Sequence, residues 1–283
     1  MTPRWDERQR AMLGALGVNW WPAGAPAARP TAPRAARVAA PETASIPIPV
    51  VAPAPVPRAT PAPAALRPVA AALAEAPQLQ RPVAQAEGLD WPELNAAIHA
   101  CRACGLCEQR RQAVPGVGHG QAQWLIVGEG PGEQEDLQGE PFVGASGQLL
   151  DAMLAALKLT RAVADPERQV FIANAVKCRP PGNRNPEPEE IAACRPFLLR
   201  QIELVRPRMV LALGRIAARA LLSSEAPLGQ LRGRVHQGPG GVPVVVSYHP
   251  AYLLRNPLEK ARAWDDLCLA ADGVEAHGAE PAP

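Results

Sequence analysis

The chain contains six cysteines: Cys101, Cys104, Cys107, Cys178, Cys194 and Cys268. The first three form a C-x-x-C-x-x-C pattern, and the next two are separated by a proline-rich loop and the start of a predicted helix. A close pair of thiols followed by two more across a loop is typical of a four-thiolate metal site. Structural zinc and an iron–sulfur cluster both fit this spacing. The second pair is not the close C-x-x-C of a zinc ribbon, which favours iron–sulfur, and Cys268 is expected to be a packed thiol.

A second group of reactive residue types lies in residues 124–147, WLIVGEGPGEQEDLQGEPFVGASG. A short apolar run, typical of a buried strand, leads directly into a glycine- and proline-rich turn at residues 128–132. Glycine lets backbone N–H groups approach a ligand closely, and open α/β sheets bind ligands beyond the carboxyl ends of their strands. An expected acidic loop over residues 133–136 follows, and then Phe142, one of only three phenylalanines. This combination favours a ligand site over a purely structural turn.

Four apolar segments predict the strands that position these groups, at residues 124–127, 169–176, 209–213 and 242–247. Helical periodicity is found at residues 91–110, 146–158, 187–205, 214–222 and 257–270. Strands that alternate with helices indicate a parallel sheet covered on both faces. The expected fold class is therefore α/β, a three-layer sandwich with a four-stranded parallel sheet flanked by helices.

Each predicted strand is followed by polar residues. Glu129 follows the first strand, Asn174 and Lys177 come at the end of the second, Arg215 follows the third, and His249 follows the fourth. Right-handed crossovers place all the carboxyl ends of parallel strands at the same edge. We therefore expect a carboxylate, an amide, a basic group and an imidazole to converge there.

Size and charge limit the class of protein only loosely. The chain has 283 residues and a formal net charge of +2. The length suffices for one α/β domain with extensions, and a local basic patch could still bind nucleic acid. No apolar run approaches the length of a membrane span, and the N-terminus lacks the long apolar core of a secretory signal. We expect a cytoplasmic protein whose cysteines do not form a disulfide framework.

Composition divides the chain into four segments. Residues 1–21 are expected to form a short helix ending in two tryptophans, a candidate docking peptide for a protein partner. Residues 22–90 hold fifteen of the 34 prolines and no aromatic residue. Such a segment cannot bury enough apolar surface to offset its ordering entropy, which predicts a disordered Pro/Ala-rich linker. Residues 91–272 are expected to be the folded domain and residues 273–283 a disordered tail.

Three stretches carry a resemblance to a known family: GEGPGEQEDLQGEPFVG (residues 128–144), NAVKCRPPGNRNPEPEEIAACRPFL (174–198) and HPAYLLR (249–255). Their order and spacing, over about residues 95–270, resemble the successive motifs of the family-four uracil-DNA glycosylases, the iron–sulfur type. The resemblance implies excision of uracil from single- or double-stranded DNA by a monomer. It also implies a [4Fe-4S] cluster, with Cys107 left out and the ligands matched by Cys101, Cys104, Cys178 and Cys194.

The resemblance assigns the uracil pocket to Glu129, Gly130, Glu135, Phe142, Asn174 and His249. Phe142 would stack on the flipped base, and the amide of Asn174 would pair with N3–H and O4, two groups that cytosine reverses. His249 would donate to O2, where negative charge develops. Of the two carboxylates, Glu135 is favoured over Glu129 for holding the attacking water. The sequence identifies no wall against the methyl group of thymine.

Two departures from other branches of the superfamily concern the chemistry. The best-known branch carries a water-orienting Asp where this chain has Gly130, which contributes backbone approach only. Another branch bonds covalently to uracil through a His on a basic insertion, and no such insertion is found near Phe142. DNA contacts are expected from Arg184, from Arg255 to phosphate, and from Leu253 as a wedge that fills the vacated stack. Core packing of Leu253 or Leu254 is the alternative.

A function from a different class stays open at this point. The concentration of cysteine and arginine around the second strand also fits a cluster- or zinc-bearing nucleic-acid-binding module without catalysis. In that case Glu129, Phe142, Asn174 and His249 would be incidental. Electron transfer fits less well, because nothing in the sequence marks a partner flavin or haem site.

Overall fold

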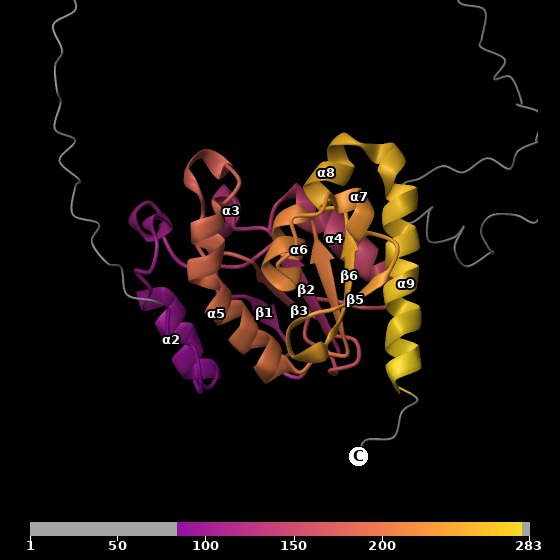
Figure 1. Cartoon of the computed structure of the whole chain (residues 1–283), viewed down its shortest axis with the longest axis horizontal. Coiled ribbons are helices and arrows are strands. Elements are labelled where there is room, and N and C mark those ends of the chain that lie inside the picture. Colours follow the sequence, from indigo (N-terminus) through magenta and orange to yellow (C-terminus); the bar gives the residue numbers. More distant parts are fainter. Residues whose placement is uncertain (1–83, 279–283) are drawn as a thin grey trace, which may run out of the picture. The chain divides into compact units, whose positions relative to one another are not determined.

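A mixed sheet forms the centre of the fold. The computed structural model describes residues 84–278, and the strands in this part of the chain have the spatial order β1-β3-β2-β4-β6-β5 (Figure 1). Their bounds are Val117–Gly118 (β1), Trp124–Gly128 (β2), Phe171–Asn174 (β3), Met209–Leu213 (β4), Val235–Gln237 (β5) and Pro243–Ser247 (β6). The four central strands run parallel, whereas β1 and β5 pair antiparallel at the two edges.

The expected four-stranded parallel sheet is thus confirmed as the centre of a larger sheet. The two edge strands were not anticipated, and both lack the apolar pattern on which the prediction relied. β1 is only two residues long and includes a glycine, and two of the three residues of β5 are exposed. Each edge strand forms because its backbone pairs with the free N–H and C=O groups of the neighbouring strand, not because its own side chains are apolar. The sequence therefore gives little indication of either strand.

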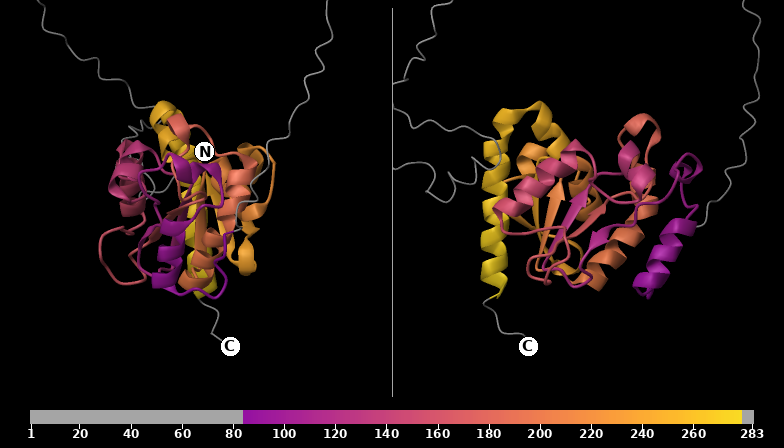
Figure 2. Two further views of the ribbon diagram at one scale, coloured as in Figure 1. Left: turned by 90° about the vertical axis from the view of Figure 1, so that its left-hand side faces the viewer. Right: turned by 180° about the vertical axis from the view of Figure 1, so that it is seen from behind.

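Helices cover both faces of the sheet, which gives the expected three layers (Figure 2). Leu125 and Val127 point to one core, shared with α2, α5, α6 and α7, whereas Trp124 and Ile126 point to the other, shared with α4, α8 and α9. The helix bounds are Trp91–Ala100 (α2), Glu133–Gln138 (α3), Ala145–Ala156 (α4), Pro188–Val205 (α5), Arg215–Leu222 (α6), Leu228–Leu231 (α7), Pro250–Arg255 (α8) and Lys260–Gly278 (α9).

Local sequence explains where two of the covering helices begin. A carboxylate of Asp90 accepts from the backbone N–H of Glu93 at 2.9 Å, and Glu93 accepts from that of Asp90 at 3.0 Å. This reciprocal capping box fixes the start of α2. The first turn of α5 is held in a similar way, because Glu190 accepts from the backbone N–H of Glu187 at 2.8 Å and Pro188 occupies the first position.

Several expected helix boundaries were wrong. The helix expected over residues 91–110 ends at Ala100, and a 3-10 turn (η1, Gly105–Glu108) follows. The expected acidic loop over residues 133–136 begins helix α3, which carries its acidic residues in the first turn, where the helix dipole favours them. α9 continues to Gly278, through residues assigned to a disordered tail, because its apolar stripe packs along the sheet.

The expected linker extends too far toward the C-terminus. Ala84 and Ala86 are buried in the first core, and Nε of Arg200 donates to the carbonyl of Leu89 at 2.6 Å. Residues 84–90 therefore belong to the folded domain. The predictions for residues 1–21, for residues 22–83 of the linker and for residues 279–283 lie outside the described residues. From residue 84 to residue 278, every helix is too short or too polar to span a bilayer.

Leu253 does not reach the surface. Its side chain is 1 % exposed and belongs to the second core together with Leu150 and Trp264. A side chain that fills a vacated base stack must project from the protein, so the expected wedge role of Leu253 is wrong and its alternative, core packing, is correct. The neighbouring Leu254, also on α8, is 45 % exposed.

These two leucines provide a matched test of the core assignment. Leu253→Ala is expected to lower the free energy of unfolding by about 2–5 kcal/mol, because it leaves a cavity in a close-packed core. Leu254→Ala is expected to change it by less than about 0.5 kcal/mol. Urea denaturation of both variants measures the difference, and equal losses would contradict the assignment.

Candidate active site and thiol cavity

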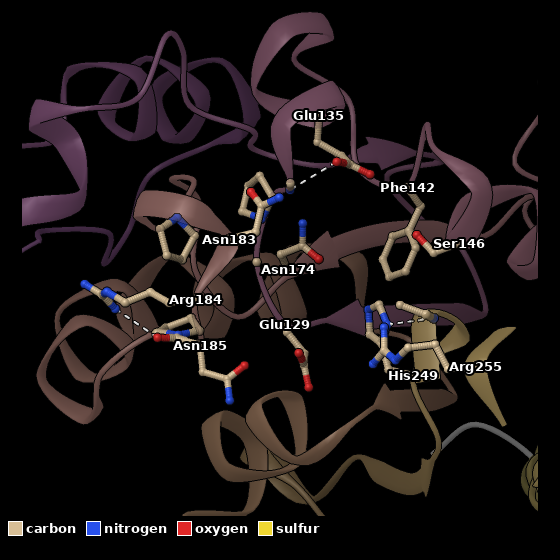
Figure 3. A pocket seen from close by; sticks show the side chains of 16 residues that line it. Glu129, Glu135, Phe142, Ser146, Asn174, Asn183, Arg184, Asn185, His249 and Arg255 are labelled. Carbon is tan, nitrogen blue, oxygen red and sulfur yellow. Dashed lines mark hydrogen bonds between the residues drawn. The ribbon is translucent and has the colours of Figure 1, made fainter. Parts of the chain in front are cut away.

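One pocket opens beyond the carboxyl ends of the central strands (Figure 3). Its lining includes every residue predicted to contact uracil or DNA except Leu253, namely Glu129, Gly130, Glu135, Phe142, Asn174, Arg184, His249 and Arg255. Neither candidate for the expected basic group lines the pocket, since Lys177 is buried and Arg215 begins α6 with its side chain exposed. The carboxylate, amide, aromatic ring and imidazole thus come together from three strand ends and one loop, as parallel topology requires.

The floor of the pocket depends on a missing side chain at Gly128. This residue ends β2 directly beside Asn174 of β3. A Cβ atom on Gly128 would collide with Oδ1 of Asn174 and with the ring of Phe142. Glycine is therefore required here, because it lets the amide and the aromatic ring approach the same strand end.

A second glycine, Gly214, lies between the side chains of Glu129 and His249. Gly214 follows β4 with φ +93°, a conformation that side chains rarely adopt. A Cβ atom there would overlap Oε1 of Glu129 and press against Cβ of His249. Glycine at position 214 therefore leaves room for the side chains of Glu129 and His249 on either side of it.

The rings of Phe142 and His249 stack on each other, with centroids 5.4 Å apart and an angle of 25° between their planes. Phe142 is 5 % exposed, and its ring belongs to the second core. Contact with the core on one side and with His249 on another fixes the ring at the pocket wall. A flat apolar surface in this position suits the face of an aromatic base.

The surroundings of His249 keep its imidazole neutral. Burial, and secondarily the charge of Arg255, lower its pKa to about 4. Nδ1 accepts from the backbone N–H of Ala251 at 3.1 Å, which caps the start of α8. The proton of the neutral ring must therefore reside on Nε2, so His249 presents a neutral donor to a ligand.

The two carboxylates of the pocket have different surroundings. Burial raises the pKa of Glu129, although the backbone N–H of Ile216 and the charges of Arg215 and Arg255 oppose that shift. Oε2 of Glu135 accepts from the backbone N–H of Gly132 at 3.0 Å and caps α3. Burial therefore makes Glu129 more basic than an ordinary glutamate, while Glu135 is held by a hydrogen bond to the start of its own helix.

Basic residues at the mouth are partly paired. Arg184 makes two hydrogen bonds to the carboxylate of Glu190, at 2.7 and 2.8 Å, and its side chain is exposed. Arg255 lies at the end of α8 and is exposed on the opposite side of the pocket (Figure 3). A polyanion would meet Arg255 directly but would have to compete with Glu190 for Arg184.

Five cysteines surround a separate small cavity, which the loops after α2 and β3 and the helix α5 enclose: Cys101, Cys104, Cys107, Cys178 and Cys194. Burial raises the pKa of Cys178 to about 11 and that of Cys194 to about 12. Among the described residues, no three potential ligands converge closely enough for a single metal ion. The thiols instead lie around the wall of a cavity.

Hydrogen-bond donors are already aimed at these sulfurs. Nη1 of Arg110 donates to Sγ of Cys178 at 2.8 Å, and the backbone N–H of Lys177 donates to Sγ of Cys194 at 3.2 Å. Donors and a positive charge beside buried sulfur favour its thiolate form, which is the form that binds metal. The donor set of this cavity therefore fits a thiolate-bound group, including an iron–sulfur cluster.

Lys177 connects the cavity to the pocket. Its ammonium is 1 % exposed and donates to the backbone carbonyl of Asn174 at 2.9 Å and to Oε1 of Gln201 at 2.6 Å. Gln201 in turn donates to the carbonyl of Pro115 at 2.7 Å. This buried network fixes the peptide that carries the pocket amide, immediately before the segment that supplies Cys178.

The family model described as "Uracil DNA glycosylase superfamily" matches residues 115–268. A type-4 uracil-DNA glycosylase of Pyrobaculum aerophilum is 42% identical over 192 residues, which are 65% of this chain and 95% of the relative. One of Thermotoga maritima is 42% identical over 166 residues, 58% of this chain and 83% of the relative. A type-5 enzyme of Thermus thermophilus is 35% identical over 154 residues, 48% of this chain and 68% of the relative.

This chain belongs to the type-4 uracil-DNA glycosylases. The resemblance stated from its three motifs is thereby confirmed. The motifs do not cover every residue that supports the type-4 site. Arg161 was not singled out for the site, and Cys107, which was left out of the ligand set, nevertheless lines the thiol cavity. Their sequence neighbours carry no pattern that predicts these contacts, which connect segments far apart in the chain.

The electrostatics of this type-4 site give a testable pKa. In an NMR titration of His249, we expect a pKa near 4 rather than about 6.5, the value for an exposed imidazole. Because the folded-state pKa is depressed, protonation opposes folding, and stability should fall as the pH drops from about 6.5 through 4. A pKa at or above 6.5 would contradict the neutral donor.

Proposed function

We propose that this protein excises uracil from DNA by hydrolysing the N-glycosidic bond, which leaves an abasic site for base excision repair. The observation that carries the proposal is the convergence of Phe142, Asn174 and His249 in one pocket at the sheet edge. A non-catalytic nucleic-acid-binding module gives no reason for that convergence.

The base enters the pocket only after it leaves the duplex. Flipping costs a few kcal/mol, and stacking on an aromatic ring returns about 1–3 kcal/mol. Phe142 supplies that ring. The amide of Asn174 accepts from N3–H and donates to O4, so cytosine would leave both partners unpaired at a cost of about 1–3 kcal/mol each.

Bond cleavage moves negative charge onto the departing base and positive charge onto the sugar. The neutral Nε2–H of His249 donates to O2 as its charge grows. A positioned donor in a site that excludes water contributes about 3–4 kcal/mol to transition-state stabilisation. Because the donor is neutral, it strengthens its interaction as the charge on O2 develops and does not attract phosphate into the pocket.

The two carboxylates divide the remaining tasks. The sequence favoured Glu135 for the attacking water, whereas the surroundings of the two side chains support Glu129. The pKa of Glu129 is raised by burial, and Glu129 approaches His249 across Gly214. A buried carboxylate of raised pKa is the better base and stabilises a sugar cation more strongly. Glu135 shapes the wall and fixes the turn that contains Gly130.

DNA contacts come from the rim of the pocket. Arg255 contacts phosphate, and Arg184 does so once it releases Glu190. In place of Leu253, the exposed Leu254 fills the gap that the flipped base leaves. We further propose that the enzyme acts as a monomer in the cytoplasm, where its cysteines stay reduced.

The cysteine cavity holds a [4Fe-4S] cluster in this proposal, with Cys101, Cys104, Cys178 and Cys194 as the ligands. The cluster would supply a cross-link between the start of the domain, the loop after β3 and α5. Arg110 and the backbone N–H of Lys177 stabilise the thiolates that hold it. Cys107 lies at the same cavity without being a ligand.

Excision itself is the first test. Uracil should be released from single- and double-stranded oligonucleotides without added metal, and cytosine and thymine should remain. His249→Ala and Asn174→Ala are expected to lower the single-turnover rate by about a hundredfold to a thousandfold, with little change in affinity for undamaged DNA. Glu129→Gln should lose more activity than Glu135→Gln. Protein that keeps its cluster but leaves uracil in place would refute the proposal.

The cofactor is tested separately. Protein purified without oxygen should be brown and contain about four irons and four labile sulfides per chain. Cys178→Ser and Cys194→Ser are expected to lose iron and visible absorption, whereas Cys107→Ser should retain both. Colourless protein with one zinc ion per chain would contradict the cluster, and loss of iron from Cys107→Ser would contradict the ligand set.

A further inference from the structure

The aromatic wall of the pocket has an unusual backbone. Phe142 adopts φ +57°, in the left-handed region that bulky side chains rarely enter. For an L-residue this conformation costs on the order of a tenfold to thirtyfold loss in population relative to extended or right-handed backbone. An unsupported peptide would therefore leave it, and the ring would move away from His249.

Two neighbours hold the carbonyl of Phe142 in place. Nη1 of Arg161 donates to it at 2.9 Å and to the carbonyl of Pro141 at 3.1 Å. On the other side, Gly147 at the start of α4 packs so closely that a Cβ atom there would collide with the same carbonyl. One guanidinium group thus holds the carbonyl groups of two consecutive peptides in place.

Arg161 is itself held rigidly. Its Nε donates to Oδ1 of Asp151 on α4 at 2.6 Å, and its backbone carbonyl accepts from the side chain of Gln169 at 3.2 Å. Gln169 precedes β3, so the guanidinium of Arg161 is tied to the helix that follows Phe142, and the backbone of Arg161 is tied to the segment that leads into the central sheet. Arg161 is 19 residues from Phe142 in the chain and does not line the pocket.

We infer that Arg161 is a positioning residue for base recognition, which holds the Phe142 peptide in the left-handed conformation that aims its ring into the pocket. This inference rests on the proposed uracil site and adds a residue that none of the three sequence motifs contains. Arg161 acts only through Phe142, so its contribution should vanish when the ring is absent.

A double-mutant cycle tests this dependence. The variants are Arg161→Ala, Phe142→Ala and their combination, with Arg168→Ala as the control, because Arg168 is an exposed arginine in the same connection. Arg161→Ala is expected to lower kcat/KM on a uracil oligonucleotide by about tenfold to a hundredfold, since charge-assisted bonds to both carbonyls are lost. Arg161→Lys, which can keep one of these bonds, should fall between. Arg168→Ala should match the parent enzyme.

Three readouts separate positioning from general stability. In the Phe142→Ala background, adding Arg161→Ala should change kcat/KM by less than about twofold. The inhibition constant for free uracil should rise in Arg161→Ala, while affinity for undamaged DNA and iron content stay unchanged. Equal losses in both backgrounds, or an unchanged inhibition constant for uracil, would overturn the inference. Should Arg161→Ala fail to fold, Arg161→Lys and Asp151→Asn carry the same comparison.

The cycle also distinguishes this inference from the proposed function. Full activity of Phe142→Ala would remove the stacking role and with it the proposed pocket. Reduced activity of Phe142→Ala together with full activity of Arg161→Ala would leave the pocket intact and refute only the role of Arg161.

Discussion

The absence of a side chain at Gly128 is the constraint on which the site depends. Parallel pairing places this residue beside Asn174, and the ring of Phe142 reaches it from a loop. Any Cβ atom would push the amide and the ring apart. The space at the sheet edge therefore exists because β2 ends in glycine. In the same way, Gly214 leaves room for the side chains of Glu129 and His249.

Burial is the main cause of the pKa shifts in both the pocket and the thiol cavity. In the pocket it keeps His249 neutral and makes Glu129 more basic, two changes that suit an uncharged donor and a base. In the thiol cavity it raises the pKa of Cys178 and Cys194, so that these two thiols ionise together with a bound cation rather than alone. One physical cause thus prepares two different chemistries.

The two sites share a single short segment. Asn174 ends β3, and four residues later Cys178 enters the thiol cavity, with the buried ammonium of Lys177 bonded to the carbonyl of Asn174 between them. A group bound by the thiols would therefore restrain the peptide that carries the amide of Asn174. The rigidity of a side chain that lines a binding pocket depends on such supporting contacts.

The sequence by itself determined the four central strands and the polar residues that follow them. A strand that is buried on both faces leaves an apolar run in the sequence, and a tight turn after a strand leaves glycine. The resemblance of three motifs to a known family assigned Phe142, Asn174 and His249 to one pocket, and they line the same pocket in the structure. Tertiary structure alone decided that Leu253 lies in the core and Leu254 outside, that Lys177 faces inward, and that Arg161 holds Phe142. Leu253 and Leu254 are adjacent on a short helix and equally apolar, so the sequence does not show which of them is buried. A contact between distant segments leaves no periodic pattern in either segment. Only the packed chain decides these outcomes.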